Sequence, residues 1–189
     1  MPCRVLVMGF GPFLSVTDNP AARLAREIDG AVRGGVAITG RVMPVSFIRS
    51  VATTQRFIEA INPSVLLGVG VATSRKVITV ESCGRNVGSG TTPDVDGQCR
   101  SLLEPSGPAE LMVTLPTQPL ASRLGAVVGA DAGRYVCNAW IYQMLRAASP
   151  ALPVGFIHIP PAGLQASRLA DALAQIEDSP DGTHPEVHR

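Results

Sequence analysis

Residues 64–72 read SVLLGVGVA, an apolar run without a charged side chain and with two glycines near its end. A short run that is apolar at every position is typical of a strand buried on both faces, as in parallel sheets. The runs RVLVMGF at residues 4–10 and VGFIHIP at residues 154–160 have the same character. The three runs therefore predict buried strands of a largely parallel sheet.

Helical patterns alternate with these strands. Asn19 before Pro20 predicts a capped helix start that continues through residues 21–28, and Ser46 predicts the cap of a helix that stops at Asn62. We expect further strands over residues 35–45, 76–82 and 111–116, and further helices over residues 120–128, 131–149 and 165–177. Such alternation predicts an α/β domain whose sheet is covered on both faces.

The domain organisation follows from length and composition. The 189 residues suit one α/β domain, which we place at residues 1–178, followed by a flexible tail at residues 179–189 that has no apolar pattern. Residues 84–110 are rich in Gly, Pro, Ser and Asp without a clear period. A stretch of this kind in a compact domain predicts a functional or a disordered loop.

Charge and cysteine usage limit the partners and the compartment. The formal net charge is +1, and Lys76 is the single lysine, which argues against a nucleic acid or an anionic membrane as partner. The amino terminus lacks the long apolar stretch of a signal peptide, and the four cysteines form no CxxC pair. We expect a reduced, cytoplasmic protein without a zinc site. The Gly-rich segments match no dinucleotide or phosphate-binding fingerprint.

Cys137 is the first candidate for chemistry. The predicted helix that starts near Asp131 puts this cysteine in its first turns, where free backbone N–H groups and the helix dipole lower a thiol pKa and favour a thiolate. The alternative is a space-filling cysteine packed beneath Trp140.

His158 and Glu81 are the second and third candidates. His158 is the only histidine before the tail and lies at the carboxyl end of a predicted strand, the edge where open α/β sheets bind ligands. A Cys with a His is the minimum for nucleophilic catalysis, and a carboxylate orients the imidazole. Glu81 ends an alternating strand. Alternatives are a hydrogen-bonded core histidine, a solvated edge carboxylate, or another acid of the irregular loop: Asp94, Asp96 or Glu104.

With these residues in view, the chain resembles the pyroglutamyl peptidase I family of cysteine peptidases, from about residue 4 to residue 177. The resemblance rests on several blocks in order: VLVMGFGPF, GRVMPV, the VES that contains Glu81, PDVDG, AGRYVCN around Cys137 and GFIHIP around His158. It implies a three-layer α/β/α sandwich with a mostly parallel, mixed central sheet.

The resemblance also implies an activity. Family members remove an amino-terminal pyroglutamyl residue from small peptides with a blocked amino terminus, and they need no metal or cofactor. It assigns the catalytic triad to Glu81, Cys137 and His158, and the slot for the lactam ring to Phe10 and Phe13, for which core packing is the alternative. It further implies a homo-oligomer, a dimer or a tetramer.

Several positions depart from the family pattern. Ser82 follows Glu81 where an Arg is usual, and the PPAGLQ segment after His158 is shorter than usual. Ala130 stands where the family usually has Asn, Asp131 follows it, and Thr91 stands where an Arg usually lies close to the substrate carbonyl. Two alternatives therefore accompany the pyroglutamyl peptidase interpretation. One is a triad-bearing relative that acts on a different cyclic or acyl amide. The other is a catalytically silent binding homologue.

Overall fold

The computed structural model of the chain describes residues 3–13 and 16–175. Its main sheet has seven strands in the spatial order β2-β3-β1-β4-β9-β5-β8. Their bounds are β1 Arg4–Phe10, β2 Val32–Arg33, β3 Val36–Met43, β4 Val65–Val71, β5 Thr79–Glu81, β8 Val127–Gly129 and β9 Val154–Ile159. Two further strands, β6 (Cys83–Arg85) and β7 (Glu110–Met112), form a separate antiparallel ribbon.

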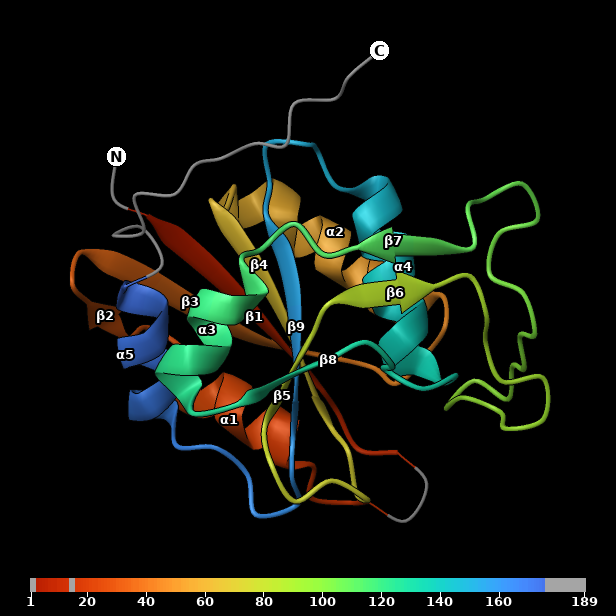
Figure 1. Ribbon diagram of the computed structural model, residues 1–189, viewed down its shortest axis with the longest axis horizontal. Coiled ribbons are helices and arrows are strands. Elements are labelled where there is room, and N and C mark those ends of the chain that lie inside the picture. The colour runs from red at the N-terminus through yellow and green to blue at the C-terminus, as the bar shows by residue number, and fades with distance from the viewer. Residues whose placement is uncertain (1–2, 14–15, 176–189) are drawn as a thin grey trace.

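The helices cover both faces of the main sheet (Figure 1). They are α1 (Pro20–Ile28), α2 (Arg49–Ile61), α3 (Thr117–Leu124), α4 (Val136–Ala147) and α5 (Ala166–Ala174). Helices α1, α3 and α5 pack on one face, and α2 and α4 pack on the other. The predicted three-layer α/β/α sandwich is therefore confirmed.

Strand pairing makes the sheet mixed, as predicted. The strands β3, β1, β4 and β9 run parallel to one another, whereas β5 pairs antiparallel with β9 and parallel with β8. The three apolar runs of the sequence are β1, β4 and β9, which lie next to one another in the middle of the sheet. Their uniform hydrophobicity reflects the two helical layers that cover them.

Two predicted helix starts are confirmed by their hydrogen bonds. The Asn19 side chain accepts a bond of 2.9 Å from the Ala21 N–H, and Pro20 is the first residue of α1. The Ser46 Oγ accepts bonds from the N–H groups of Ile48 and Arg49, where α2 begins. These acceptors satisfy N–H groups that have no partner inside a helix.

Three other predictions are wrong in detail. The segment 111–116 does not add a strand to the main sheet, because its first residues form β7 of the ribbon. The helix expected over 120–128 is α3, which ends at Gly125 in the left-handed conformation (φ 54°), and the chain then enters β8. Asp131 does not cap α4, whose first residue is Val136. Strands of three residues are too short to give a readable period.

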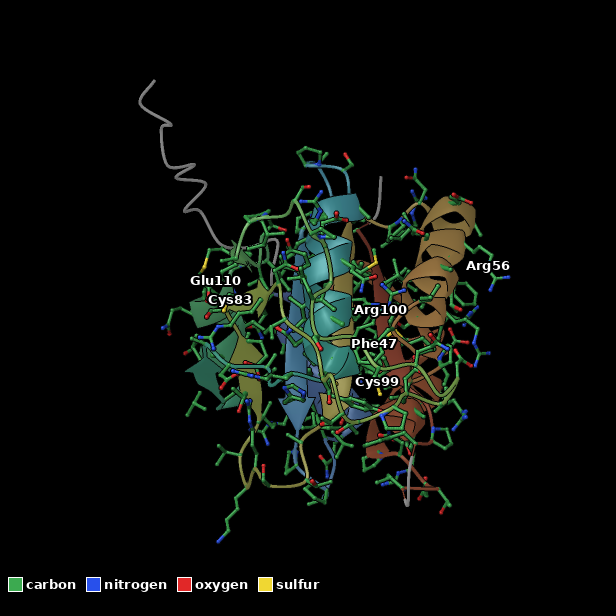
Figure 2. All side chains as sticks on the ribbon, turned by 90° about the vertical axis from the view of Figure 1, so that its right-hand side faces the viewer. Phe47, Arg56, Cys83, Cys99, Arg100 and Glu110 are labelled. Atoms are coloured by element: carbon green, nitrogen blue, oxygen red, sulfur yellow. The ribbon has the colours of Figure 1, made fainter. Side chains whose placement is uncertain are left out.

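The loop predicted within residues 84–110 has no helix or strand between β6 and β7. It extends beyond the outer side of α4 (Figure 1), and Figure 2 shows Cys99 and Arg100 on it. The buried Asp94 carboxylate orders this loop, because it accepts hydrogen bonds from the N–H groups of Phe47, Asp96 and Gln98. The predicted tail, residues 179–189, lies outside the described residues.

The two faces of the sheet carry different cores. Under α1, α3 and α5 the buried side chains are aliphatic apart from Cys3, and we call this the aliphatic face. Under α2 and α4 lie all five phenylalanines, both tyrosines and the single tryptophan, and we call this the aromatic face. The predicted site residues belong to the aromatic face.

Candidate active site

Cys137 is the second residue of α4. Tyr135 is the N-cap, but its side chain does not cap the helix, since its hydroxyl donates a bond of 2.8 Å to the Pro93 carbonyl. The first intrahelical bond runs from the Ala139 N–H to the Tyr135 carbonyl. The N–H groups of Val136 and Cys137 thus point out of the start of the helix without an intrahelical partner. The helix begins later than the sequence predicted, which places the Cys137 side chain closer to the positive end of the helix dipole.

Two glycines of β4 make room for α4 on the sheet. A Cβ atom on Gly68 would lie 2.4 Å from both Trp140 and Phe156. A Cβ atom on Gly70 would lie 2.8 Å from the Cys137 sulfur and 3.3 Å from the His158 ring. Side chains at these two positions would collide with the helix or its neighbours. The glycines therefore allow Cys137 and His158 to approach the same point from helix and strand.

The sheet register brings Glu81 to His158. On the antiparallel pair β5–β9, His158 lies opposite Thr79, and Glu81 lies opposite Phe156. Glu81 and His158 are thus diagonal neighbours whose side chains share one face of the sheet. The imidazole Nδ1 and the Glu81 Oε1 are 2.6 Å apart, and both side chains are buried. This contact leaves Nε2 as the ring nitrogen available to a second group.

Arg75 also contacts this pair. Its guanidinium forms an ion pair with the same Glu81 oxygen, and its Nη2 donates a hydrogen bond of 2.5 Å to the carbonyl oxygen of Asp131. Arg75 was not predicted from the sequence, because nothing in the local pattern shows that a loop residue contacts the end of β5.

A cavity of about 510 Å³ opens at this point. Cys137, His158 and Arg75 line it together with the predicted slot residues Phe10 and Phe13. Further lining comes from Val16, Asn19, Val45, Val71, Ala72, Thr73, Ser74, Asp131, Ala132, Gly133, Arg134 and Tyr135. The volume lies in the range of sites for small ligands.

The aromatic wall of the cavity has a defined geometry. Phe10 is buried and packs on Phe156 with ring centroids 6.3 Å apart, so it serves the core as well as the cavity. Phe13 packs on Tyr135 at 6.3 Å, and Tyr135 meets Phe47 edge-to-face at 5.8 Å. Tyr135 was not predicted from the sequence, although an aromatic residue two positions before Cys137 is a signal that could have indicated it.

The electrostatics of Cys137 differ from the expectation. Burial raises the pKa of the Cys137 thiol to about 12, and repulsion by the Glu81 carboxylate acts in the same direction. A backbone hydrogen bond and the positive charge of Arg75 lower the pKa by smaller amounts. The prediction that the helix start gives a thiol with a lowered pKa is therefore wrong, because burial outweighs it. This shift favours the neutral thiol at rest.

A model of the pyroglutamyl peptidase family matches residues 3–172 of the chain. The chain belongs to the pyroglutamyl peptidase family. It is 35% identical over 184 residues to the pyrrolidone-carboxylate peptidase of Escherichia fergusonii, covering 93% of this chain and 86% of the relative. It is 36% identical over 170 residues to the pyrrolidone-carboxylate peptidase of Mycobacterium tuberculosis, covering 83% of this chain and 77% of the relative.

Solved structures of the pyroglutamyl peptidase family share the fold. The pyroglutamyl peptidase I of Bacillus amyloliquefaciens has a TM-score of 0.83 at 28% identity, with 93% of each chain covered. The pyrrolidone carboxyl peptidase of Thermococcus litoralis has a TM-score of 0.81 at 27% identity, with 93% of this chain and 92% of the other covered. These similarities confirm the predicted family and the prediction of a peptidase.

The other predicted candidates lie elsewhere in this family member. The Asp94 carboxylate bonds to the loop backbone, and Asp96 pairs with Arg49. The Glu104 N–H donates to the Asn86 side chain. These contacts do not involve His158. Cys83 is buried on β6, where its thiol contacts the Ala130 carbonyl. Within the described ranges 3–13 and 16–175, no helix is long and apolar enough to cross a membrane.

Proposed function

We propose that this chain hydrolyses the amide bond that follows an amino-terminal pyroglutamyl residue, with Cys137 as nucleophile, His158 as general base and acid, and Glu81 as the group that orients the imidazole. One observation carries the proposal: the Nδ1 of His158 bonds to Glu81 at 2.6 Å while the ring and the Cys137 thiol border one cavity. This geometry matches the roles that a nucleophile, its base and an orienting group require.

The first half-reaction forms a thioester. As the Cys137 sulfur attacks the pyroglutamyl carbonyl carbon, the Nε2 of His158 takes the thiol proton. This transfer is needed during the attack, because the raised thiol pKa keeps the resting group neutral. The tetrahedral intermediate then expels the peptide amine, to which His158 returns the proton. Glu81 accepts the hydrogen bond from Nδ1–H and stabilises the imidazolium between these steps.

Backbone groups at the start of α4 are suited to hold the oxyanion. The N–H groups of Val136 and Cys137 have no intrahelical partner and lie at the positive end of the helix dipole. Donors aimed at a developing negative charge in a partly dry site contribute about 10²–10³ in rate.

The second half-reaction releases the pyroglutamyl group. His158 takes a proton from water, whose oxygen attacks the thioester carbon. Collapse of this intermediate breaks the C–S bond, and the proton returns to the Cys137 sulfur. The products are free pyroglutamate and the resting enzyme, so no cofactor takes part.

The aromatic wall gives the substrate preference its physical basis. A lactam ring is flat and neutral, and it suits a slot formed by flat apolar side chains with a few hydrogen-bonding groups nearby. We propose Phe10 and Phe13 as slot residues and add Tyr135, whose ring packs on Phe13. The substrates that fit are small peptides with a blocked amino terminus.

We also propose a reducing, cytoplasmic setting and a homo-oligomer. The first rests on the need to keep the Cys137 thiol reduced, and Cys83, Cys99 and Cys137 form no disulfide among the described residues. The second rests on the family resemblance, and light scattering with size-exclusion chromatography tests it as a dimer or a tetramer.

The test compares three proteins on a fluorogenic pyroglutamyl amide: the wild type, Cys137→Ser and Cys99→Ser. Cys99 is an exposed cysteine on the loop beyond α4 (Figure 2), so its variant is the matched control. We expect turnover in the wild type and in Cys99→Ser, and a loss of at least about 10³-fold in Cys137→Ser.

Two outcomes would contradict the proposal. No pyroglutamyl turnover with rapid hydrolysis of another cyclic or acyl amide would favour the altered-substrate alternative, for which Asp131 at the cavity is the relevant departure. Turnover of no amide, with a Cys137 thiol no more reactive than an ordinary thiol, would favour the binding homologue.

A further inference from the structure

The guanidinium of Arg75 joins two parts of the site that are far apart in the sequence. It pairs with the Oε1 of Glu81, the same oxygen that contacts His158, and it donates to the Asp131 carbonyl in the loop that leads to Cys137. Arg75 thus contacts both the orienting carboxylate and the segment before the nucleophile.

Burial makes this contact energetically important. Glu81 is 0% exposed, and its second oxygen, Oε2, has no hydrogen-bond partner among the described residues. Gly129 of β8 leaves the space beside it, since a Cβ atom there would lie 3.1 Å from Oε2. A buried carboxylate is costly unless a positive charge or donors compensate it. Here the compensation comes from Arg75 and from the His158 ring, both through Oε1.

We propose that Arg75 is a positioning residue of the reaction, which holds the Glu81 carboxylate in place for His158 and fixes the loop before Cys137 to the end of β5. The inference rests on the proposed function of the triad and deepens it. Arg75 acts through Glu81 and forms no bond with the scissile amide.

Charge supports the same role. The Glu81 carboxylate raises the pKa of the Cys137 thiol, whereas Arg75 lowers it. Of the two other charged side chains of the cavity wall, Asp131 is itself an anion and cannot balance a buried carboxylate, and Arg134 is exposed and balances it less well. Asp131 places its Oδ1 3.7 Å from the Nη1 of Arg85, and Arg134 faces solvent. Without Arg75, the Glu81 carboxylate would be held less firmly and its negative charge would be less well compensated.

The first test is a double-mutant cycle with Arg75→Gln, Glu81→Gln and the combined variant, measured as kcat and KM on the pyroglutamyl amide. We expect Arg75→Gln alone to lower kcat about 10- to 100-fold with little change in KM, as for partners that orient a catalytic group from behind. In the Glu81→Gln background the same change is expected to cost less than about 3-fold, because Arg75 acts through that carboxylate.

Two variants control for charge and folding. Arg75→Lys keeps the positive charge but cannot reach the carboxylate and the carbonyl together, so we expect an intermediate kcat. Arg56→Gln removes an exposed arginine on the outer side of α2 (Figure 2) and leaves kcat unchanged. Arg75→Gln unfolds if Glu81 becomes an unpaired buried charge. In that case the combined variant, which lacks this charge, is expected to fold. The comparison of Glu81→Gln with the combined variant then still measures the effect of Arg75→Gln without the carboxylate.

The second test needs no substrate. Iodoacetamide labels Cys137 at pH 8, and peptide mass spectrometry follows each cysteine separately. We expect Arg75→Gln to slow labelling of Cys137 about 3- to 10-fold, with Arg75→Lys in between and Arg56→Gln at the wild-type rate. The exposed Cys99 is the internal reference, and faster labelling of the buried Cys83 would report unfolding.

The outcomes separate this inference from the proposed function. Slower labelling in Arg75→Gln supports the role of Arg75 even if the wild type cleaves no pyroglutamyl amide. Two results with an active wild type would overturn the inference and leave the proposed function intact. One is that the kcat losses of Arg75→Gln and Glu81→Gln multiply in the combined variant. The other is that Cys137 in Arg75→Gln is labelled at the wild-type rate. A raised KM with unchanged kcat also overturns it, because that would make Arg75 a substrate-binding residue.

Discussion

The aliphatic and aromatic faces of the sheet share the same strands but solve different packing problems. On the aliphatic face, α1, α3 and α5 pack through Val, Leu, Ile and Ala side chains. On the aromatic face, α4 lies over Gly68 and Gly70, and large rings such as Trp140 and Phe156 fill the space around them. One face is a continuous hydrocarbon layer, whereas the other combines tight contacts with a cavity.

The two faces of the sheet are therefore expected to contribute differently, the aliphatic face to stability and the aromatic face to catalysis. On the aromatic face, Gly68 and Gly70 let the start of α4 lie close to the sheet, so that Cys137 and His158 border one cavity. Rings then supply rigid walls with few rotatable bonds. We therefore expect changes on the aliphatic face to alter the free energy of unfolding, and changes around the cavity to alter turnover.

The largest expected contrast is between His158→Gln and Leu169→Ala. Loss of the general base lowers kcat/KM about 10²–10⁴-fold. Leu169 is fully buried on α5, and its truncation costs about 2–5 kcal/mol of unfolding free energy without changing kcat per folded molecule. Urea unfolding and turnover on both variants check this. Wild-type activity in His158→Gln would contradict the proposed role of His158 as general base.

Glycine substitutions sharpen the comparison. In Gly70→Ala the new Cβ would meet the Cys137 sulfur at 2.8 Å, so we expect kcat to fall at least about tenfold through misplacement of the nucleophile. In Gly40→Ala on β3 the new Cβ would lie 1.8 Å from the Ala25 carbonyl oxygen of α1, so we expect a stability loss of about 1–3 kcal/mol or more. If Gly70→Ala and Gly40→Ala lost equal activity per folded molecule, catalysis would not depend specifically on the aromatic face.

The pH dependence of labelling tests the electrostatics of the aromatic face. The thiolate is the reactive form, and burial raises the Cys137 thiol pKa to about 12. Below that pKa each unit of pH increases the thiolate fraction about tenfold, so alkylation of Cys137 should rise steadily from pH 6 to about 10. A plateau near neutral pH, measured beside exposed Cys99, would instead indicate a thiolate–imidazolium pair at rest.

A smaller effect is expected from a buried hydrogen bond under α4. The Trp140 Nε1–H donates to the Thr54 Oγ1 at 3.0 Å, and Thr54 in turn donates to the Ser50 carbonyl. Thr54→Val leaves the indole N–H buried without an acceptor and should cost about 1–3 kcal/mol in urea unfolding. In a Trp140→Phe background the same change should cost less, and an equal cost would show that this bond contributes nothing.

The smallest effect is expected at the surface of the aliphatic side. Arg23 on α1 pairs with Asp18, and both side chains are exposed to solvent. Arg23→Gln should change the unfolding free energy by less than about 0.5 kcal/mol, because water and salt screen such pairs. The Arg75–Glu81 pair has the same kind of charges, but its carboxylate is buried. An equally small stability change in Arg75→Gln would therefore contradict the importance that we assign to burial.

The sequence predicted the fold well where patterns are long. The apolar runs that became β1, β4 and β9, and the caps at Asn19 and Ser46, depend on neighbours in the chain and were readable. The short strands β2, β6 and β8 were missed, because three residues or fewer show no period and their pairing is decided by tertiary contacts.

The site was predictable only in part. Cys137, His158 and Glu81 were predicted from position and family resemblance, whereas Arg75 and Gly70 contact these residues only through the tertiary structure. No local pattern shows that a glycine of β4 faces a helix start, or that Asp131 lies in a loop before α4 instead of capping it. The sign of the Cys137 pKa shift likewise depends on burial, which only the packed structure reveals.

The proposed mechanism requires that Cys137 form a covalent thioester with the pyroglutamyl group. Rapid acid quenching during turnover, followed by intact-mass measurement and peptide mapping, tests it directly. We expect a pyroglutamyl adduct on Cys137 and on no other cysteine, and no adduct in Cys137→Ser. Sustained hydrolysis without any adduct, or with an adduct on Cys83 or Cys99, would contradict it.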